Sequence, residues 1–440
     1  MVFIRATYTQ SGQAVSLLAP AAAPRQAGAT TAGVDPASTL VGQKVARLLR
    51  DGAIQPEGLA VSGLAEVANR LAGALDDSEL VLAAVGSADL AVAAFDREAQ
   101  SDATLAQAFE AATHADDAED AVKAIAGAGE AGYADGVGDK ARFHYPYAVA
   151  ADAAGAFYVA DYRNHRVRKV APDGTVSTLV GGEAGYADGS SLEARFSSPR
   201  GIAIDSAGNL YVVDTGNARI RKIGPDGTVS TLAGGEAGFA DGQGATARFN
   251  DPRGIAVDKQ GHVYVADTGN HRIRKISPEG LVSTLVTLPG PEEAAPPQGA
   301  KLAGPFGVAV DGWGRVFVAD ATANAILLLD AEGGVTTFAG SGAYGDADGP
   351  ADAAAFRSPV GLAVDKAGTL YVADCFNHTI RQVAADGRVT TVAGSGTPGA
   401  LDGAPLAARF YGPYGLAIAP DGRLVVADTS NHAIRTVKLP

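Results

Sequence analysis

The chain has 440 residues, of which 47% are hydrophobic and 19% charged, so it can bury a large core. Its formal net charge of −14 argues against a protein whose main task is to grip nucleic acid, because that affinity comes largely from lysine and arginine. The single cysteine, Cys375, excludes an internal disulfide and a zinc site with several thiolates.

The first residues do not form a basic segment followed by an apolar run, which argues against a signal peptide. No apolar stretch is long enough to span a bilayer. We therefore expect a soluble, cytoplasmic protein without a membrane span, and export by a route that needs no signal peptide stays open.

Residues 1–36 are predicted to form a strand pair and a linker. Met1–Tyr8 and Gln13–Leu18 flank Ser11 and Gly12, which suit a hairpin turn. The tract that follows, up to residue 36, is rich in alanine and proline and has no periodicity, as is typical of a linker.

Residues 37–118 are predicted to form an acidic helical domain. Apolar residues recur there at helical spacing, for example Leu64, Val67 and Leu71. The first 126 residues hold eight basic and sixteen acidic side chains, so most of the net charge lies in this part. We expect this region to dock the chain to itself, to a partner or into a larger assembly.

A long repeat occupies residues 119–440. One aspartate recurs every 53 or 54 residues, at positions 161, 214, 267, 320, 374 and 428. Each copy contains four short β-branched or aromatic runs separated by turn residues, which predicts four strands. In the second copy these strands are Gly201–Asp205, Leu210–Asp214, Arg219–Ile223 and Val229–Ala233.

Six such units predict a six-bladed β-propeller, a mainly β fold. The first strand of each copy carries a small residue at an equivalent place, as a strand near a crowded axis requires: Ala150, Ala203, Ala256, Ala309, Ala363 and Ala417. The sixth copy ends after its third strand, Ala433–Val437. Residues near 122–127 match the end of a repeat, so we expect them to supply the missing outer strand and close the ring.

The repeat resembles the NHL family. The resemblance covers about residues 121–440 and depends on the patterns P-x-G-[ILV]-A-[IV]-D, [LV]-Y-V-[AV]-D-x-x-N and [IV]-R-[KQT]-[IV]. The fourth copy departs from these patterns: Asn324 is shifted by one place, and Leu327 and Leu328 replace the basic pair.

The residue before each inner strand is predicted to line the mouth of the central channel. Around the ring these residues are Tyr147, Arg200, Arg253, Phe306, Val360 and Tyr414. Two arginines beside three aromatic rings would suit an anionic or aromatic group, or an acidic loop of a protein partner. The alternative is that they only fill and solvate a structural channel.

Four histidines follow asparagine in the turns between the second and third strands. They are His165, His271, His378 and His432, and we count them as candidate binding residues. They lie on different blades, too far apart to converge on a metal, so hydrogen bonds within their own loops are the simpler interpretation.

The recurrent aspartates and the asparagines that follow them are interpreted as turn-makers that bond backbone N–H groups. The acidic loops that contain Glu130, Asp135 and their equivalents suggest calcium ligands. Arg142 and its equivalents follow in the same loops, which favours internal aspartate–arginine pairs instead. No cofactor and no metal are predicted.

The resemblance implies several functions. Amidating lyases of this architecture hold zinc with histidines at the starts of inner strands, and lactonases hold calcium in the channel. The predicted mouth residues offer neither ligand set. RNA-binding members present a basic face, whereas residues 127–440 hold 27 basic and 33 acidic side chains. We therefore favour a non-catalytic binding or scaffold protein with a protein partner or a small ligand, and keep a channel-located hydrolase or lyase and an RNA binder as alternatives.

Overall fold

A computed structural model describes residues 3–10, 13–20, 122–127, 129–287, 302–330 and 334–439. The chain divides into two compact units, Met1–Asp120 and Ala121–Pro440. In the first unit, β1 (Phe3–Gln10) pairs antiparallel with β2 (Gln13–Pro20). The helical domain predicted for residues 37–118 lies outside the described residues.

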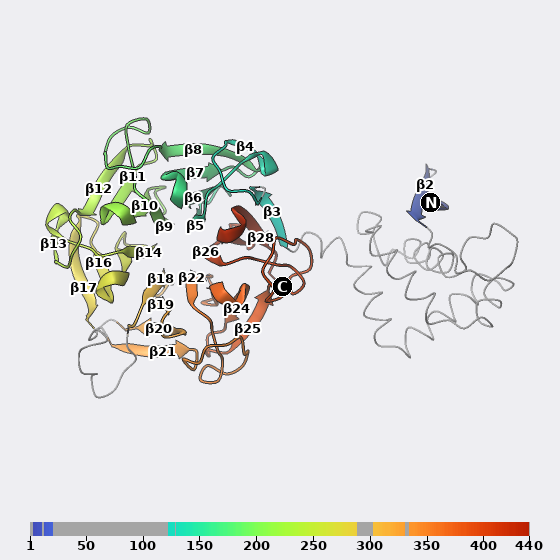
Figure 1. The fold of residues 1–440 in the computed structure, drawn as a ribbon. Coiled ribbons are helices and arrows are strands. Elements are labelled where there is room, and N and C mark those ends of the chain that lie inside the picture. Colours follow the sequence, from blue (N-terminus) through green and yellow to red (C-terminus); the bar gives the residue numbers. More distant parts are fainter. Residues whose placement is uncertain are drawn as a thin grey trace, which may run out of the picture. The chain divides into compact units, whose positions relative to one another are not determined.

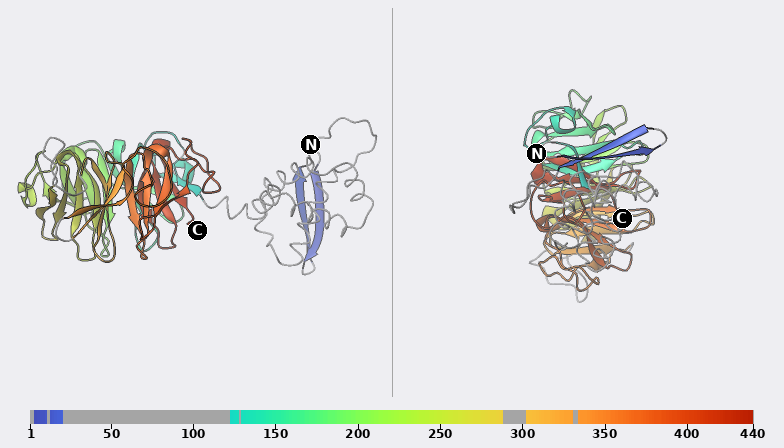
Figure 2. Two further views of the ribbon diagram at one scale, coloured as in Figure 1. Left: turned by 90° about the horizontal axis from the view of Figure 1, so that it is seen from below. Right: turned by 90° about the vertical axis from the view of Figure 1, so that its right-hand side faces the viewer.

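The second unit is a six-bladed β-propeller, as predicted. Its described residues form six antiparallel sheets around one axis (Figure 1). Viewed from the side, the sheets stand next to one another around the ring (Figure 2). We number the blades one to six in chain order, beginning with the sheet that contains residues 146–181.

Each blade has four main strands, counted from the axis outward. The inner strands are β5 (Pro146–Ala151), β9 (Pro199–Ile204), β14 (Pro252–Val257), β18 (Pro305–Val310), β22 (Pro359–Val364) and β26 (Pro413–Ile418). The second strands are β6 (Phe157–Asp161), β10 (Leu210–Asp214), β15 (Val263–Asp267), β19 (Val316–Asp320), β23 (Leu370–Asp374) and β27 (Leu424–Asp428).

The third strands are β7 (Arg166–Val170), β11 (Arg219–Ile223), β16 (Arg272–Ile276), β20 (Ala325–Leu329), β24 (Thr379–Val383) and β28 (Ala433–Val437). The outer strands are β8 (Thr175–Gly181), β12 (Val229–Gly234), β17 (Leu281–Thr287), β21 (Val335–Ala339), β25 (Val389–Ala393) and β3 (Val122–Ala126). Two short strands, β4 (Gly136–Val137) and β13 (Gly242–Gln243), extend blades one and three.

Single-turn 3-10 helices lie in two kinds of loop. Those between second and third strands are η3 (Tyr162–Asn164), η4 (Thr215–Asn217), η6 (Thr268–Asn270), η7 (Cys375–Asn377) and η8 (Thr429–Asn431). The other two, η2 (Gly138–Lys140) and η5 (Gly244–Thr246), precede blades one and three.

The ring closes where the sequence predicts. Strand β3 pairs with β28, with Val122 opposite Val437 and Ala126 opposite Ile434. Val122 and Val437 are fully buried. A strand from the start of the propeller therefore completes the last sheet and covers the edge of β28, which would otherwise offer unpaired backbone groups.

The inner strands approach one another because glycine follows the mouth residue in five of the six copies. A Cβ at Gly254 would overlap the carbonyl oxygen of Phe306 on the next blade, and one at Gly361 would overlap that of Tyr414. Glycine is needed here for close approach between strands. This proximity brings the six mouth residues into one ring.

The hydrophobic core lies between neighbouring sheets. In one cluster, Val167 and Val180 of blade one are buried together with Val212 and Ile223 of blade two. Each sheet is thus apolar on both faces, and side-chain alternation along the strands does not separate a buried from a solvated face.

Candidate functional site

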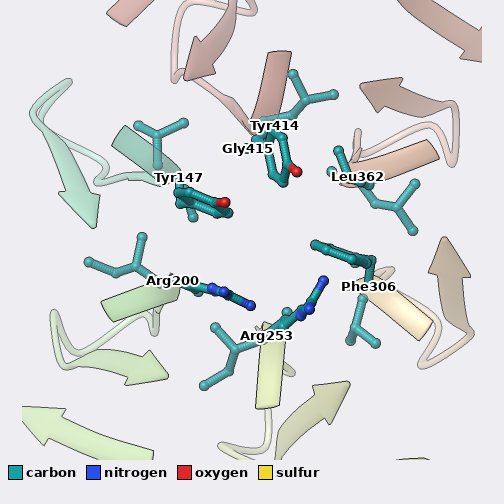
Figure 3. Close-up of a pocket in the computed structure, with 18 residues that line it drawn as sticks. Tyr147, Arg200, Arg253, Phe306, Leu362, Tyr414 and Gly415 are labelled. Atoms are coloured by element: carbon teal, nitrogen blue, oxygen red, sulfur yellow. The ribbon is translucent and has the colours of Figure 1, made fainter. Parts of the chain in front are cut away.

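The five polar and aromatic mouth residues predicted from the repeat come together at a single pocket. Its lining includes Tyr147, Arg200, Arg253, Phe306, Val360 and Tyr414, each from the start of a different inner strand. The space at this pocket, counted together with the solvent at its open mouth, is about 530 Å³. In Figure 3 the two arginines and the three aromatic rings all project toward the axis.

The two arginines share one carboxylate. Arg253 donates to Asp251 Oδ2 from Nε at 2.9 Å and from Nη2 at 2.6 Å. Arg200 donates to Asp251 Oδ1 from Nη1 at 3.1 Å. The side chains of Arg200, Arg253 and Asp251 are 17%, 24% and 37% exposed, respectively. Two cations and one anion leave a net positive charge at the mouth of the channel.

Aromatic rings hold the guanidinium groups in place. The Arg253 guanidinium lies 4.0 Å from the centre of the Phe306 ring. That of Arg200 lies 5.4 Å from the Tyr147 ring and 5.2 Å from the Tyr162 ring. Such cation–π contacts restrict the arginine rotamers.

The aromatic rings also contact one another. Tyr147 and Tyr414 are 4.6 Å apart between ring centres, and Phe306 and Tyr414 are 6.1 Å apart. Together they form a preorganised wall beside the two charged groups.

The surroundings of the tyrosine hydroxyls shift their pKa values. Burial raises the pKa of Tyr147, although Arg200 opposes the shift. Burial raises the pKa of Tyr414 too, and Cys375 adds to that shift. At Tyr162 burial also acts against ionisation, but a hydrogen bond to Arg200 and the charge of that residue outweigh it and lower the pKa. The mouth therefore favours negative charge beside Arg200.

Sequence reasoning missed Asp251 and Tyr162. Asp251 precedes the proline of its repeat, where the other copies have Tyr145, Ser198, Gly304, Ser358 and Gly412, so it is the one charged residue at this position. Its carboxylate accepts from the arginine two residues later, Arg253. That charge difference within the repeat is the signal that could have identified it.

The four histidines lie outside the lining of the pocket. They are not bonded within their own loops, and this part of the sequence interpretation is corrected. His165 Nδ1 accepts from the backbone N–H of Ser198 at 3.0 Å, at the start of the next blade. His378 and His432 accept in the same way from Gly412 and Tyr145. They connect neighbouring blades because each ends its 3-10 turn in the left-handed conformation, which directs the ring across the blade boundary.

His271 bonds to the next blade through a different partner. Its Nδ1 lies 2.8 Å from the carbonyl oxygen of Ala303, so this nitrogen donates.

The recurrent aspartates do bond backbone N–H groups, as predicted. They also form buried ion pairs that the sequence interpretation did not include. Asp214 Oδ1 accepts from the Ser197 N–H at 2.7 Å, and its Oδ2 accepts from Arg221 Nη1 at 2.8 Å. Neither Asp214 nor Arg221 is exposed. Equivalent buried arginines occupy four other blades: Arg168, Arg274, Arg381 and Arg435.

The acidic loops are paired internally, but with partners other than those expected. The loop aspartate Asp188 accepts from the buried Arg221 at 2.6 Å, and the loop arginine Arg195 lies 3.6 Å from Glu183 instead. The loop aspartate pairs with the buried arginine because the loop passes over the third strand of its blade. Its oxygens also accept from the N–H and hydroxyl of Thr231, so they are already engaged.

Cys375 is buried beside Tyr414. Burial raises the pKa of its thiol to about 12, and a hydrogen bond to Tyr414 opposes part of that shift. Such a thiol is a poor nucleophile at neutral pH.

Comparison with known proteins agrees with the fold. The sequence model of the NHL repeat matches residues 143–170, 196–223, 249–276, 356–383 and 410–436. Five of the six blades thus contain an NHL repeat. No matched segment lies in blade four, where Leu327 replaces the buried arginine.

Curated relatives match the chain over part of their own length. The chain is 33% identical over 279 residues to Protein SUPPRESSOR OF QUENCHING 1, chloroplastic, of Arabidopsis thaliana, covering 59% of this chain and 26% of that protein. It is 30% identical over 340 residues to NHL repeat-containing protein 2 of Gallus gallus, covering 67% and 46%. The chain thus spans less than half the length of these relatives.

Solved structures show the same fold. A protein of unknown function from Bacteroides thetaiotaomicron matches with a TM-score of 0.58 and 20% identity over 72% of this chain and 76% of that one. An auxiliary nutrient binding protein from the same species matches with a TM-score of 0.56 and 19% identity over the same shares. Within the described part of this chain, no helix is long and apolar enough to cross a bilayer.

Proposed function

We propose that the NHL propeller is a non-catalytic binding module whose channel mouth accepts an acidic group of a small ligand or of a partner's loop. The observation that carries the proposal is a pair of arginines, Arg200 and Arg253, that share Asp251. Both line a pocket whose other side chains include aromatic ones. A concave pocket with a few convergent polar groups is the usual form of a binding site.

The lining supports binding rather than hydrolysis. Among the described residues around the pocket, the polar side chains are two arginines and two tyrosines, and burial raises the pKa of both tyrosines. A general base at neutral pH needs a pKa near the working pH, and burial moves the pKa of both tyrosines further from it.

The same geometry favours a compact ligand over nucleic acid. Arg200 and Arg253 are mostly buried and half neutralised by Asp251, so they do not form the extended basic surface that follows a phosphate backbone. Docking through residues 37–118 and a cytoplasmic location stay predictions.

A thermal-shift screen of the full chain against small acids, amines and neutral compounds tests the proposal. Acids that bind should raise the melting temperature of the wild type and of a control variant, Arg195→Ala/Arg248→Ala. The two arginines replaced in the control lie in outer loops and are 53% and 49% exposed. The same acids should fail to shift Arg200→Ala/Arg253→Ala. Mass spectrometry after incubation should recover each ligand unchanged. Equal shifts in all three proteins, or conversion of a ligand, would contradict the proposal.

A further inference from the structure

The arginine pair at the mouth keeps donors that Asp251 does not use. Each guanidinium has five N–H groups. The Asp251 carboxylate takes two from Arg253 and one from Arg200. The Arg200 guanidinium also lies 5.2 Å from the centre of the Tyr162 ring. Most of the donors on this pair are therefore left for a second anion, and one more negative charge would bring the cluster to neutrality.

The neighbouring surface is aromatic on the side that faces these donors. Phe306, Tyr147 and Tyr414 stand around the axis with the arginines between them (Figure 3). A ring inserted here would contact aromatic faces, and a carboxylate attached to it would lie within reach of the guanidinium groups. A planar carboxylate matches the planar fork of arginine, which can bind it with two parallel hydrogen bonds.

We propose that the mouth binds a small aromatic carboxylate, and that Asp251 competes with this ligand for the charge of Arg200 and Arg253. This inference rests on the proposed function and specifies its ligand class. The carboxylate of the ligand takes the open donors of the two arginines, and its ring packs against Tyr147, Phe306 and Tyr414. Asp251 lowers the affinity because it already neutralises one of the two cations.

Asp251→Asn is a clean test of the competition. Asp251 has a φ of +45°, and asparagine tolerates this left-handed conformation at least as well as aspartate. The amide oxygen can still accept from an arginine, while the negative charge is gone. Asp421→Asn is the matched control, because Asp421 accepts from Arg423 in a different loop that does not line the pocket.

The experiment is isothermal titration of the full chain with benzoate, benzamide and acetate. Benzoate should bind, and both neutral benzamide and ring-free acetate should bind at least tenfold more weakly. Asp251→Asn should bind benzoate at least fivefold more tightly than the wild type, and Asp421→Asn should match the wild type. The inference would be overturned if benzamide bound as tightly as benzoate. It would also be overturned if Asp251→Asn bound benzoate with the same affinity as the wild type or more weakly.

The two proposals fail in different ways. If the screen finds ligands that need Arg200 and Arg253 but benzoate binds to none of the proteins, the binding function stands and the ligand class is wrong. If benzoate binds equally to the wild type and to Arg200→Ala/Arg253→Ala, the channel mouth is not the site and both proposals fall.

Discussion

Arg221 and Asp214 form an ion pair from which water is excluded: Arg221 Nη1 lies 2.8 Å from Asp214 Oδ2, and neither side chain is exposed. Arg221 also donates to the carbonyl oxygens of Ala187 and Arg195. The Arg221 side chain, from the third strand of blade two, thus bonds both the second strand and the loop that precedes the blade. Buried charges are tolerated when their hydrogen bonds are met in this way.

Replacing Arg221 by leucine should destabilise the propeller by about 3–5 kcal/mol, because Asp214 is left as a buried charge without a cation. The measurement is urea unfolding followed by circular dichroism. Arg195→Leu is the control, since Arg195 is 53% exposed, and it should cost no more than about 1 kcal/mol. Equal losses in the two variants would contradict a structural role for the buried pair.

Blade four shows how the same aspartate is accommodated without an arginine. Leu327 stands at the arginine position, and Asp320 accepts instead from the backbone N–H groups of Ala303, Gly304, Thr322 and Ala323. Burial raises the pKa of Asp320 even so. A leucine in blade two would lack this backbone arrangement, because there Asp214 accepts from one backbone N–H, that of Ser197.

Ring closure predicts a contrast between adjacent residues of β3. Val122 is fully buried against β28, whereas Lys123 is exposed. Val122→Asp should cost several kcal/mol, on the order of 3 or more, because it buries a charge in the closing sheet. Lys123→Asp should change the stability by less than about 1 kcal/mol. Thermal unfolding measures the two stabilities, and size-exclusion chromatography should show aggregation of Val122→Asp but not of Lys123→Asp. The same melting temperature for both variants would argue against closure by β3.

The histidines at the blade boundaries should occupy different tautomers. His165, His378 and His432 accept at Nδ1 and therefore carry the proton on Nε2, whereas His271 donates from Nδ1 to Ala303. Long-range ¹H–¹⁵N spectra of histidine-labelled protein distinguish the two forms. The expected result is three residues with Nε2–H and His271 with Nδ1–H, and one tautomer shared by all four would contradict the boundary contacts.

Protonation of these rings should weaken the blade boundaries. Burial lowers the pKa of His165, His378 and His432, so their contribution to stability is present above about pH 6.5 and is lost as the pH falls through the lowered values. In His378→Asn the amide oxygen replaces Nδ1 as acceptor, as Asn324 does toward Ser358 at 3.0 Å. This variant should lose less stability than the wild type between pH 7 and pH 5, measured by urea unfolding, and a larger loss would contradict the assignment.

The contribution of Asp428 to stability should change with pH in the opposite direction to that of the histidines. Burial raises the pKa of Asp428 from 3.8 to about 6, although Arg435 opposes the shift. The folded state then holds the proton more tightly, so this contribution to stability is complete below about pH 3.8 and is lost as the pH rises through 6. Relative to Asp428→Asn, the wild type should lose stability between pH 4 and pH 7, by roughly 2 kcal/mol. A difference that stays constant with pH would show that Asp428 is ionised throughout.

The repeat predicted most of the fold because its turns and small inner residues recur at a fixed spacing. The second copy folds with β10 and β11 at the predicted bounds, and β9 begins at Pro199, two residues earlier than expected. The burial of Arg221 was missed because both faces of each sheet are packed, so alternation alone cannot show which charged residue has a partner. One of its two partners, Asp188, lies on a distant loop that only the tertiary structure brings into place.

The mouth residues were predictable because each occupies one repeat position at the start of an inner strand. Their charge balance was missed, because Asp251 lies at a different repeat position and joins the mouth only through its hydrogen bonds to Arg200 and Arg253. The histidines illustrate the same limit. Their turn was predicted, but the direction of the ring follows from the left-handed residue that ends it, and this carries Nδ1 of His165 to the next blade.

The crystal structure of Asp251→Asn grown with saturating benzoate tests the central claim most directly. We expect a carboxylate within hydrogen-bonding distance of both Arg200 and Arg253, with the ring against Tyr147, Phe306 and Tyr414. An empty channel mouth, or benzoate bound only at another surface, would contradict it.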